Sequence, residues 1–402
     1  MTLSQVELLA PAGDKEKLNT ALYFGADAVY LGGKQFSLRT FADNFSRDGL
    51  RDAVAQAHAL GKKIYVTANV FAKNADFVQM ADYFVYLSTI GVDGVIVSDP
   101  GVIYLIKKVA PALCVHLSTQ ANTTNKYAVK FWAEQGVSRV ILARELSIAE
   151  IADIHDFNDG VELETFVHGA MCISYSGRCL LSDYLDGRSS NRGACVQACR
   201  WKYEVRAFDA TGQKSDWLPV EEDGKCTYIF NSKDLNMLAH LHDLQGAGVS
   251  SFKIEGRMKS PYYLATVIGA YRRYMDGADM GAAEKELLAV AHRDYTTAYA
   301  FGKNASTVHY DDSQSKGEYV YIASVLGNED GYAIVEMRNR FKKGDTLQVL
   351  APHVEHGKDF VVEQIIDSNG QEVEDAKLVQ SVYKLACPYR LRKGDFLRRK
   401  VQ

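Results

Sequence analysis

Residues 6–33 read VELLAPAGDKEKLNTALYFGADAVYLGG, and this stretch contains the repeating unit of the chain. An apolar run at 6–13 is followed by residues 14–24, whose apolar positions have helical spacing. Gly25 and a second apolar run at 28–33 come next. A glycine that ends a helix shortly before a buried strand is typical of β/α units with parallel strands. The stretch therefore predicts an α/β fold.

The same rhythm continues beyond this stretch. Helical patterns such as RDGLRDAVAQAHALGK and ADFVQMADYFVYLSTIGVD separate seven strand candidates before about residue 170, and SFKIEGRMKS with PYYLATVIGAYRRYM supplies an eighth unit. Eight units over about 250 residues predict a (β/α)8, TIM-like barrel. The alternative is an open doubly wound sheet, although no G-x-G-x-x-G follows the first strand. The strands are expected to begin at Val6, Ala28, Lys63, Gly94, Cys114, Arg139, Val161 and Ser251.

The chain changes character near its C-terminal end. Short β-branched and aromatic runs separated by turn pairs such as Asn369-Gly370 predict a small antiparallel β-barrel domain at 317–402. We therefore expect a catalytic barrel domain at 1–280, with a cysteine-rich insertion at about 170–226, and a helical or irregular connector at 281–316.

Composition limits the classes of function. The 402 residues are 47% hydrophobic and carry a net charge of -4, which predicts a globular protein without overall attraction to nucleic acid. The absence of a leader pattern or a long apolar run predicts a cytoplasmic protein that does not enter a membrane. An RNA-binding site must then be a local basic patch. The last part of the chain contains a run of basic residues that is either such a patch or a charged face that only contacts water. Its residues are Arg390, Arg392, Lys393, Arg398, Arg399 and Lys400.

Four of the seven cysteines lie in the stretch FVHGAMCISYSGRCLLSDYLDGRSSNRGACVQACRWKY. Cys172 and Cys179 form a C-x6-C pair, and Cys195 and Cys199 a C-x3-C pair. Zinc sites prefer shorter spacings than that of the first pair, whereas iron–sulfur clusters accept loops of varied length. Spacing alone therefore leaves three alternatives open, namely an iron–sulfur cluster, a zinc site and unliganded thiols. The stretch follows the seventh strand, which in a barrel leads to the catalytic rim. Cys114 and Cys387 lie in apolar runs and are expected to be buried core thiols.

Polar residues collect where the predicted strands end, and this rim carries the site in a barrel. Strand ends meet water and are often polar anyway, so the set is more informative than any member. In HLSTQAN, period-two spacing predicts that His116, Ser118, Gln120 and Asn122 share the inner side of one strand. Candidate substrate-binding residues at this rim are Asn69, Asp99, Gln120, Asn122, Arg144, Lys253 and Arg257, and candidate proton carriers are His116, Glu145, His168 and Glu255.

The motif ETFVHGAMC, followed by GRCLLS, is identified as a signature of the peptidase U32 family, and the chain resembles the tRNA hydroxylation branch of that family. ELLAPAG, HLSTQAN, VILARELS, NSKDL and FKIEGRMKSPYY extend the resemblance over nearly the whole chain. It implies oxygen-independent hydroxylation of the tRNA wobble uridine to 5-hydroxyuridine, with prephenate as hydroxyl donor. It also implies a 4Fe-4S cluster held by Cys172, Cys179, Cys195 and Cys199, with Cys226 as the alternative to Cys199, and in some members a paralogous U32 partner.

Further expectations depend on this resemblance. Prephenate carries two carboxylates, which arginine binds in a bidentate manner, so Arg39, Arg144 and Arg257 are expected to hold it unless they only pair with rim carboxylates. Unpaired RNA bases stack on aromatic rings, and the aromatic residues flanking the cysteines are either such a surface or core. They are Tyr175, Tyr184, Trp201 and Tyr203.

Two rival functions remain. The family label suggests a collagenase-like peptidase, but the chain has neither H-E-x-x-H nor G-x-S-x-G. The other rival is a non-catalytic RNA-binding protein with a structural cluster.

Overall fold

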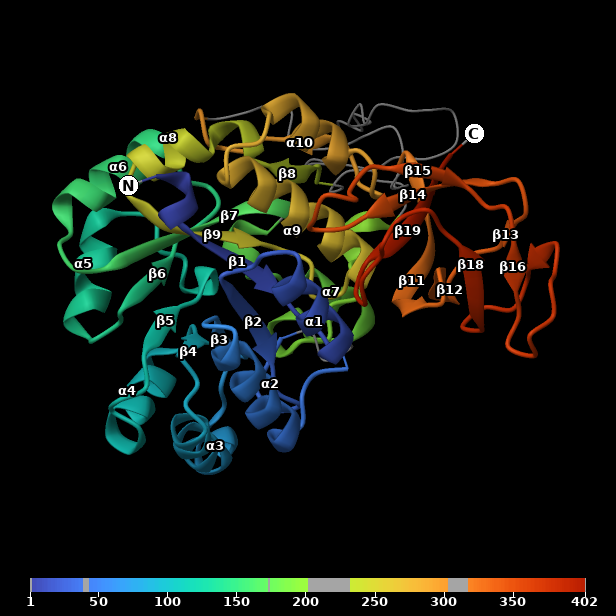
Figure 1. Cartoon of the computed structure of the whole chain (residues 1–402). Helices are drawn as coiled ribbons and strands as arrows, with labels where there is room; N and C mark the ends of the chain where they lie inside the picture. Colours follow the sequence, from blue (N-terminus) through green and yellow to red (C-terminus); the bar gives the residue numbers. More distant parts are fainter. Residues whose placement is uncertain (1, 39–42, 173, 202–231, 303–316, 402) are drawn as a thin grey trace, which may run out of the picture. The chain divides into compact units, whose positions relative to one another are not determined.

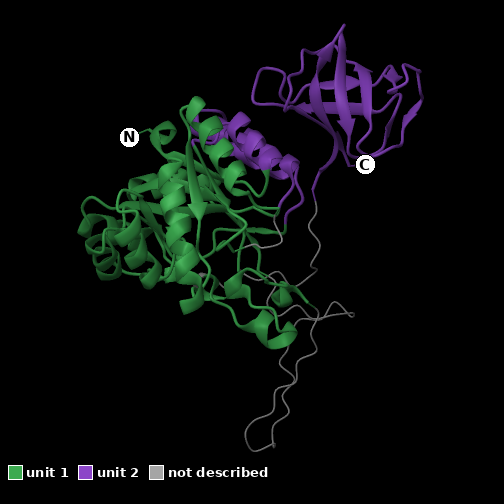
Figure 2. Cartoon of the chain, turned by 90° about the horizontal axis from the view of Figure 1, so that it is seen from below, with its two compact units in different colours: residues 1–14, 28–258, 293–315 green, residues 15–27, 259–292, 316–402 purple. Residues whose placement is uncertain are grey.

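The computed structural model describes residues 2–38, 43–172, 174–201, 232–302 and 317–401. Arg39, Tyr203 and Cys226 lie outside these ranges. The chain divides into two compact units, which Figure 2 shows in green and purple. Unit 1 contains residues 1–14, 28–258 and 293–315, and unit 2 contains residues 15–27, 259–292 and 316–402.

Unit 1 is built around a closed barrel of parallel strands (Figure 1). Consecutive strands from β1 to β7 pair in parallel, and β9 pairs in parallel with both β7 and β1. This closure confirms the TIM-like barrel, and the open-sheet alternative is wrong. The strands are β1 (Glu7–Pro11), β2 (Ala28–Gly32), β3 (Lys63–Thr67), β4 (Gly94–Val97), β5 (Val115–Leu117), β6 (Arg139–Ile141), β7 (Glu162–Ala170) and β9 (Val249–Ile254).

Helices follow strands β2 to β6 and lie outside them (Figure 1). Ser46 caps the first of these helices through the Gly49 amide at 3.1 Å, as the N-cap preference of serine predicts. Gly61, Gly91 and Gly136 follow three of the helices with φ of 66°, 77° and 77°. These left-handed conformations confirm that glycine ends these helices. The helices are α2 (Arg47–Ala59), α3 (Phe77–Thr89), α4 (Pro100–Val109), α5 (Lys126–Glu134) and α6 (Ile148–Phe157).

Part of the inside of the barrel is an apolar cluster. Alternate residues of each strand point to the same face, so Leu9, Tyr30, Tyr65, Ile96 and Ile141 come together in one buried cluster from five strands. Burying each large apolar side chain contributes about 1.5–3 kcal/mol, so this cluster is a substantial part of the barrel's stability.

Charged residues lie inside the barrel toward the N-terminal ends of its strands. Arg139 is only 3% exposed, and its Nη1 lies 2.5 Å from Glu7 Oε1 and 3.2 Å from Glu164 Oε2. Its Nε also donates to Glu162 Oε2 at 2.7 Å. Burial by itself lowers the pKa of Arg139, but Glu7 and Glu164 more than reverse this and raise it. The barrel therefore contains a compensated ionic network that joins β1, β6 and β7.

Unit 2 contains helices α1 (Lys15–Tyr23), α9 (Pro261–Met275) and α10 (Met280–Leu287) and an antiparallel β domain. The sheet has the order β15-β14-β19-β11-β12-β18-β16, and its two end strands are not paired with each other among the described residues. The domain is therefore a curled half-barrel around a core that includes Ile322, Val335, Leu347 and Leu397. No helix in the described part of the chain is long and apolar enough to cross a membrane.

The β domain consists of antiparallel strands in two sheets. They are β11 (Tyr319–Glu329), β12 (Tyr332–Met337), β13 (Phe341–Lys342), β14 (Thr346–Leu350), β15 (Asp359–Val361), β16 (Ile365–Ile366), β17 (Asp375–Ala376), β18 (Val382–Ala386) and β19 (Phe396–Lys400), and β13 pairs with β17 in a separate two-stranded sheet.

We predict that Arg139→Met lowers the free energy of unfolding by roughly 3–5 kcal/mol, because it leaves buried carboxylates without their cation. The matched control is Arg47→Met, which removes a cation from an exposed pair with Asp82. This variant is expected to change the free energy of unfolding by about 0–1 kcal/mol. Urea unfolding followed by tryptophan fluorescence measures both. Equal, small losses in the two variants would contradict a stabilising role of the network.

Candidate functional site at the barrel rim

Lys253 and Glu164 form a buried ion pair inside the barrel. The distance between Lys253 Nζ and Glu164 Oε1 is 2.6 Å, and the side chains are 4% and 0% exposed. Lys253 Nζ also lies 4.4 Å from the centre of the Tyr30 ring and 5.5 Å from that of Phe166. Glu164 therefore compensates the charge of this predicted substrate-binding lysine, whose ammonium still has further N–H donors.

Arg144 lies where β7 leads into the cysteines. Its Nη1 donates to the Ala170 carbonyl at 3.3 Å, and its Cζ lies 5.3 Å from the centre of the Phe166 ring. Its Nε is buried and has no hydrogen-bond partner among the described residues. A buried donor without a partner costs free energy. Arg144 is thus a predicted carboxylate-binding residue with an unused donor in the described structure.

Arg257 is 3% exposed, and its guanidinium is surrounded by protein oxygens. It donates to Ser37 Oγ at 2.9 Å, Thr67 Oγ1 at 3.1 Å and Asn44 Oδ1 at 2.5 Å. A Cβ on Gly32 would lie 2.3 Å from Arg257 Nη2, so glycine is needed there. These contacts show Arg257 bracing the segment after β2, whereas the sequence predicted a substrate contact.

His116 is buried against Tyr65, with ring centres 4.5 Å apart. Burial first, and then the positive charges of Arg139, Lys253 and Lys63, hold its pKa well below the usual value, so the imidazole is neutral at pH 7. Its Nδ1 is buried and makes no hydrogen bond to the described residues. The ring fits because position 94 is glycine, where a Cβ would lie 3.0 Å from Nε2.

The other candidate proton carriers lie at the ends of β6, β7 and β9. His168 is 1% exposed, with its ring 5.5 Å from that of Tyr295. Glu255 accepts a hydrogen bond from Tyr30 Oη at 3.1 Å, and Glu145 is partly buried. Lys253 and Glu255 thus contact the same Tyr30 side chain.

Asn69 and Gln120 link two loops of the rim, since Asn69 Nδ2 donates to Gln120 Oε1 at 2.9 Å. The prediction that Gln120 and Asn122 continue the strand of His116 is wrong, because β5 ends at Leu117. Ser118 instead caps a 3-10 turn (Thr119–Ala121), and Asn122 is left-handed with φ 59°. Asp99 accepts a hydrogen bond from the Val102 amide at 3.1 Å and so caps α4.

The cysteine segment, residues 172–201, is attached to the loops that follow β3 and β5. Arg178 Nε donates to the Gln120 carbonyl at 2.6 Å, and Arg192 Nη1 donates to the Phe71 carbonyl at 2.7 Å. Arg192 Nη1 also lies 3.0 Å from Asp76 Oδ2, and this hydrogen bond is the main reason why the pKa of Asp76 is lowered. The segment therefore lies at the C-terminal ends of the barrel strands, as the sequence predicted.

All four cysteines of the segment are free and partly buried. Burial raises the pKa of Cys199, the positive charge of Arg200 lowers it, and Cys172, Cys195 and Cys179 raise it by smaller amounts. Backbone amides donate to Cys179 Sγ and Cys195 Sγ, each at 3.4 Å. Such amide–sulfur bonds and four thiols suit an iron–sulfur cluster chemically. Within the described ranges, however, no three His, Cys, Asp or Glu side chains are placed to hold a metal ion.

The structure corrects one prediction about burial and decides one open alternative. Cys114 is exposed, so the expectation of a core thiol is wrong there, whereas Cys387 is partly buried. Trp201 is 42% exposed, and Tyr175 and Tyr184 are 56% and 87% exposed, so these aromatic side chains are not core.

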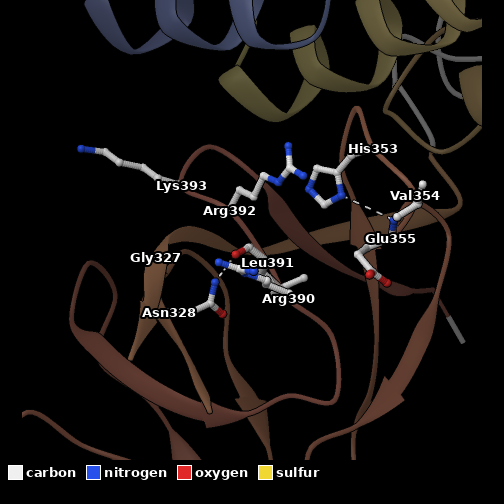
Figure 3. A pocket seen from close by; sticks show the side chains of 9 residues that line it. All are labelled: Gly327, Asn328, His353, Val354, Glu355, Arg390, Leu391, Arg392 and Lys393. Atoms are coloured by element: carbon white, nitrogen blue, oxygen red, sulfur yellow. Dashed lines mark hydrogen bonds between the residues drawn. The ribbon is translucent and has the colours of Figure 1, made fainter. Parts of the chain in front are cut away.

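The basic run of the β domain separates into two groups. Arg398 is 3% exposed and binds Glu286 through Nη1 at 2.5 Å and Nη2 at 2.9 Å, and Arg399 binds Asp345 at 2.5 Å. Arg390, Arg392 and Lys393 instead line a cavity of about 660 Å³ (Figure 3). Sequence reasoning missed the residue that shapes this loop, Asp395, because a lone aspartate in a Gly-Asp pair indicates only a turn.

We predict that Arg192→Gln speeds labelling of Cys179 and Cys195 by a thiol reagent roughly fivefold in metal-free protein, because a partly exposed ion pair contributes at most about 1 kcal/mol to holding the segment. Mass spectrometry of labelled peptides measures the rates. Arg51→Gln, which removes an exposed pair with Asp48, is the control and should leave them unchanged. An unchanged rate in Arg192→Gln would mean that this contact does not anchor the segment.

The chain is similar in sequence to named proteins of Bacillus subtilis and Escherichia coli. The chain is 38% identical over 404 residues to tRNA hydroxylation protein P1 of Bacillus subtilis (strain 168), covering 98% of this chain and 94% of that protein. It is 36% identical over 415 residues to tRNA hydroxylation protein P of Escherichia coli (strain K12), covering 91% and 90%. It is also 38% identical over 278 residues to 23S rRNA 5-hydroxycytidine C2501 synthase of Escherichia coli (strain K12), covering 69% of this chain and 40% of that protein.

Family models match both parts of the chain. Residues 13–310 match Peptidase family U32, and residues 317–398 match Peptidase family U32 C-terminal domain. The resemblance stated from the motifs is therefore confirmed, and the chain belongs to peptidase family U32.

Proposed function

We propose that this protein is a tRNA-modifying enzyme that converts wobble uridine to 5-hydroxyuridine without molecular oxygen, using prephenate and a 4Fe-4S cluster. The observation that carries the proposal is that the segment containing four free cysteines is attached to loops at the C-terminal ends of the barrel strands. The names of the two tRNA hydroxylation relatives and of the rRNA synthase support hydroxylation of an RNA base. A tRNA substrate supports a cytoplasmic location.

Cys172, Cys179, Cys195 and Cys199 would hold the cluster, with Cys226 as the alternative fourth ligand. Replacing the C5 hydrogen of uracil by a hydroxyl is a two-electron oxidation. The ring C–O bond of prephenate breaks and its hydroxyl goes to C5 at the hydroxide level, while the ring becomes aromatic by loss of CO2. The C5 hydrogen leaves as a proton, and an external one-electron carrier accepts the two electrons in two steps. The four cysteines would hold the cluster, which would supply one-electron transfer when bound. Amide hydrogen bonds to Cys179 and Cys195 lower the electron density on sulfur and so tune that chemistry.

Prephenate has two carboxylates, and the rim offers cations for them. Arg144 has a buried donor without a partner in the described structure, so we propose it as the main carboxylate-binding residue. Lys253, oriented by Glu164, donates a further hydrogen bond. Arg257 supports the site indirectly by holding Ser37 and Thr67 in place.

Glu145, His168, Glu255 and His116 are the proton carriers that we propose. Burial and the nearby cations keep His116 neutral and disfavour its protonation at pH 7, so it is the weakest base of this set. The exposed rings of Tyr175, Tyr184 and Trp201 lie on the cysteine segment and are suited to stacking on an unpaired base. The partner is tRNA, and a paralogous U32 protein is a further candidate partner.

The first experiment compares nucleosides of tRNA from a deletion strain carrying each variant. Cys172→Ala is expected to lose 5-hydroxyuridine and its derivatives completely, because the cluster loses a ligand. Cys114→Ala is the matched control, since Cys114 is exposed and outside the cysteine segment, and it should restore the modification.

The same two variants test the cluster. Anaerobically purified wild type and Cys114→Ala should absorb broadly in the visible, and Cys172→Ala should not. Colourless wild-type protein containing stoichiometric zinc would overturn the iron–sulfur proposal. Peptide cleavage that persists in Cys172→Ala, with unchanged tRNA in the deletion strain, would favour the peptidase alternative. Tight tRNA binding with no hydroxylation under any condition would favour a non-catalytic RNA-binding protein.

Arg144→Gln is expected to raise the KM for prephenate roughly 10- to 100-fold, because a hydrogen bond to a charged group contributes about 1.5–3 kcal/mol. The KM for tRNA should stay unchanged. Steady-state hydroxylation of unmodified tRNA at varied prephenate measures this, with Arg51→Gln as the surface control. An unchanged KM for prephenate would remove Arg144 from the carboxylate site.

A further inference from the structure

We infer that the cavity beside Arg390, Arg392 and Lys393 in the β domain binds phosphate groups of the tRNA backbone. This inference rests on the proposed function only in taking tRNA as the ligand. The contact that it proposes involves residues outside the cysteine segment. The cavity has a volume of about 660 Å³ (Figure 3). It is lined by Gly327, Asn328, His353, Val354, Glu355, Arg390, Leu391, Arg392 and Lys393.

The charge pattern of the domain marks this cavity as different from its surroundings. Most other cations on the domain are paired with carboxylates, for example Arg340 with Asp375 and Lys384 with Glu329, and Lys342 and Lys400 are the exceptions among the described residues. Arg390, Arg392 and Lys393 form no ion pair with any described residue, and they follow one another closely in one loop. Adjacent unpaired cations repel one another and are stabilised by a bound polyanion.

The acidic groups near the cavity do not neutralise these cations. Glu355 Oε2 lies 2.7 Å from Lys358 Nζ, so its charge is already compensated. Asp395 is fully buried, and its carboxylate lies 2.9 Å from His353 Nε2. The cavity wall therefore presents uncompensated positive charge.

Buried hydrogen bonds hold the cationic loop in one shape. Asp395 accepts from the Arg392 amide at 2.7 Å and from Tyr23 Oη at 3.0 Å. The Gly394 amide donates to the Val325 carbonyl at 3.1 Å, and Asn328 Nδ2 donates to the Leu391 carbonyl. Because the loop is already ordered, a ligand that binds it loses little conformational entropy.

The directions of the side chains favour a chain of phosphates over one compact anion. In Figure 3, Arg392 reaches toward His353, whereas Lys393 extends in another direction. Cations spread along a loop match successive phosphates of a nucleic-acid backbone, which position an RNA without reading its sequence. A free nucleotide shares the phosphate chemistry, so the experiment must separate these two sources.

The test uses the full-length triple variant Arg390→Gln/Arg392→Gln/Lys393→Gln. The matched control, Arg340→Gln/Lys343→Gln/Lys384→Gln, removes the same charge from the same domain, but only from cations that are paired with carboxylates. Fluorescence anisotropy measures the Kd for full-length tRNA between 50 and 300 mM salt, and thermal unfolding checks that both variants fold. Single Lys393→Gln is a milder variant that keeps the test valid if the triple variant does not fold.

Each lost phosphate contact lowers the slope of log K against log salt by about 0.7–0.9. We expect the triple variant to lose about two to three units of slope, Lys393→Gln about one, and the control none. Equal slopes in the cavity variants and the wild type would overturn the inference. Binding of ATP by the wild type that is lost in the triple variant, with an unchanged tRNA slope, would overturn it in favour of a free nucleotide.

The binding assay contains no prephenate and requires no catalysis, so its result is separate from that of the proposed function. A reduced slope together with a failure to form 5-hydroxyuridine would overturn the proposed hydroxylase and leave the phosphate site standing. An unchanged slope together with intact formation of 5-hydroxyuridine would overturn the phosphate site and leave the proposed hydroxylase standing.

Discussion

One buried carboxylate, Glu164, connects the parts of the barrel on which the rim depends. It accepts from Lys253 of β9 at 2.6 Å and from Arg139 of β6 at 3.2 Å, while its own strand pairs with both of these strands. A buried carboxylate without a cation is costly, so these strands are held in one register by charge as well as by backbone pairing. The rim loops start from strand ends whose positions this network helps to determine.

Above this network, the candidate site is made from loops that hold one another. Arg257 joins the segment that follows β2 to the last residue of β3, and Asn69 reaches Gln120 after β5. Arg178 and Arg192 attach the cysteine segment to the loops after β5 and β3. Buried interactions of this kind orient a site more precisely than loops alone. The thiols, the Arg144 donor and the neutral His116 all belong to unit 1.

Several features of this site followed from the sequence, and others did not. Strand order, the glycine ends of the helices and the rim position of the cysteines were readable because they depend on local periodicity and chain order. The expectation that Gln120 and Asn122 continue the strand of His116 failed for a local reason, because Ser118 caps a 3-10 turn that begins before Gln120. The prediction for Cys114 failed because its apolar neighbours gave no sign that this residue, which directly precedes β5, is exposed.

Charges show the limit of sequence reasoning most clearly. By itself the sequence determined the barrel, the antiparallel domain, the cluster of cysteines and a run of basic residues. Only the tertiary structure decided which of those cations are available, because Glu286 and Asp345, which neutralise Arg398 and Arg399, lie 112 and 54 residues away in the chain. Electrostatic pairing depends on distance in space, which local patterns do not encode.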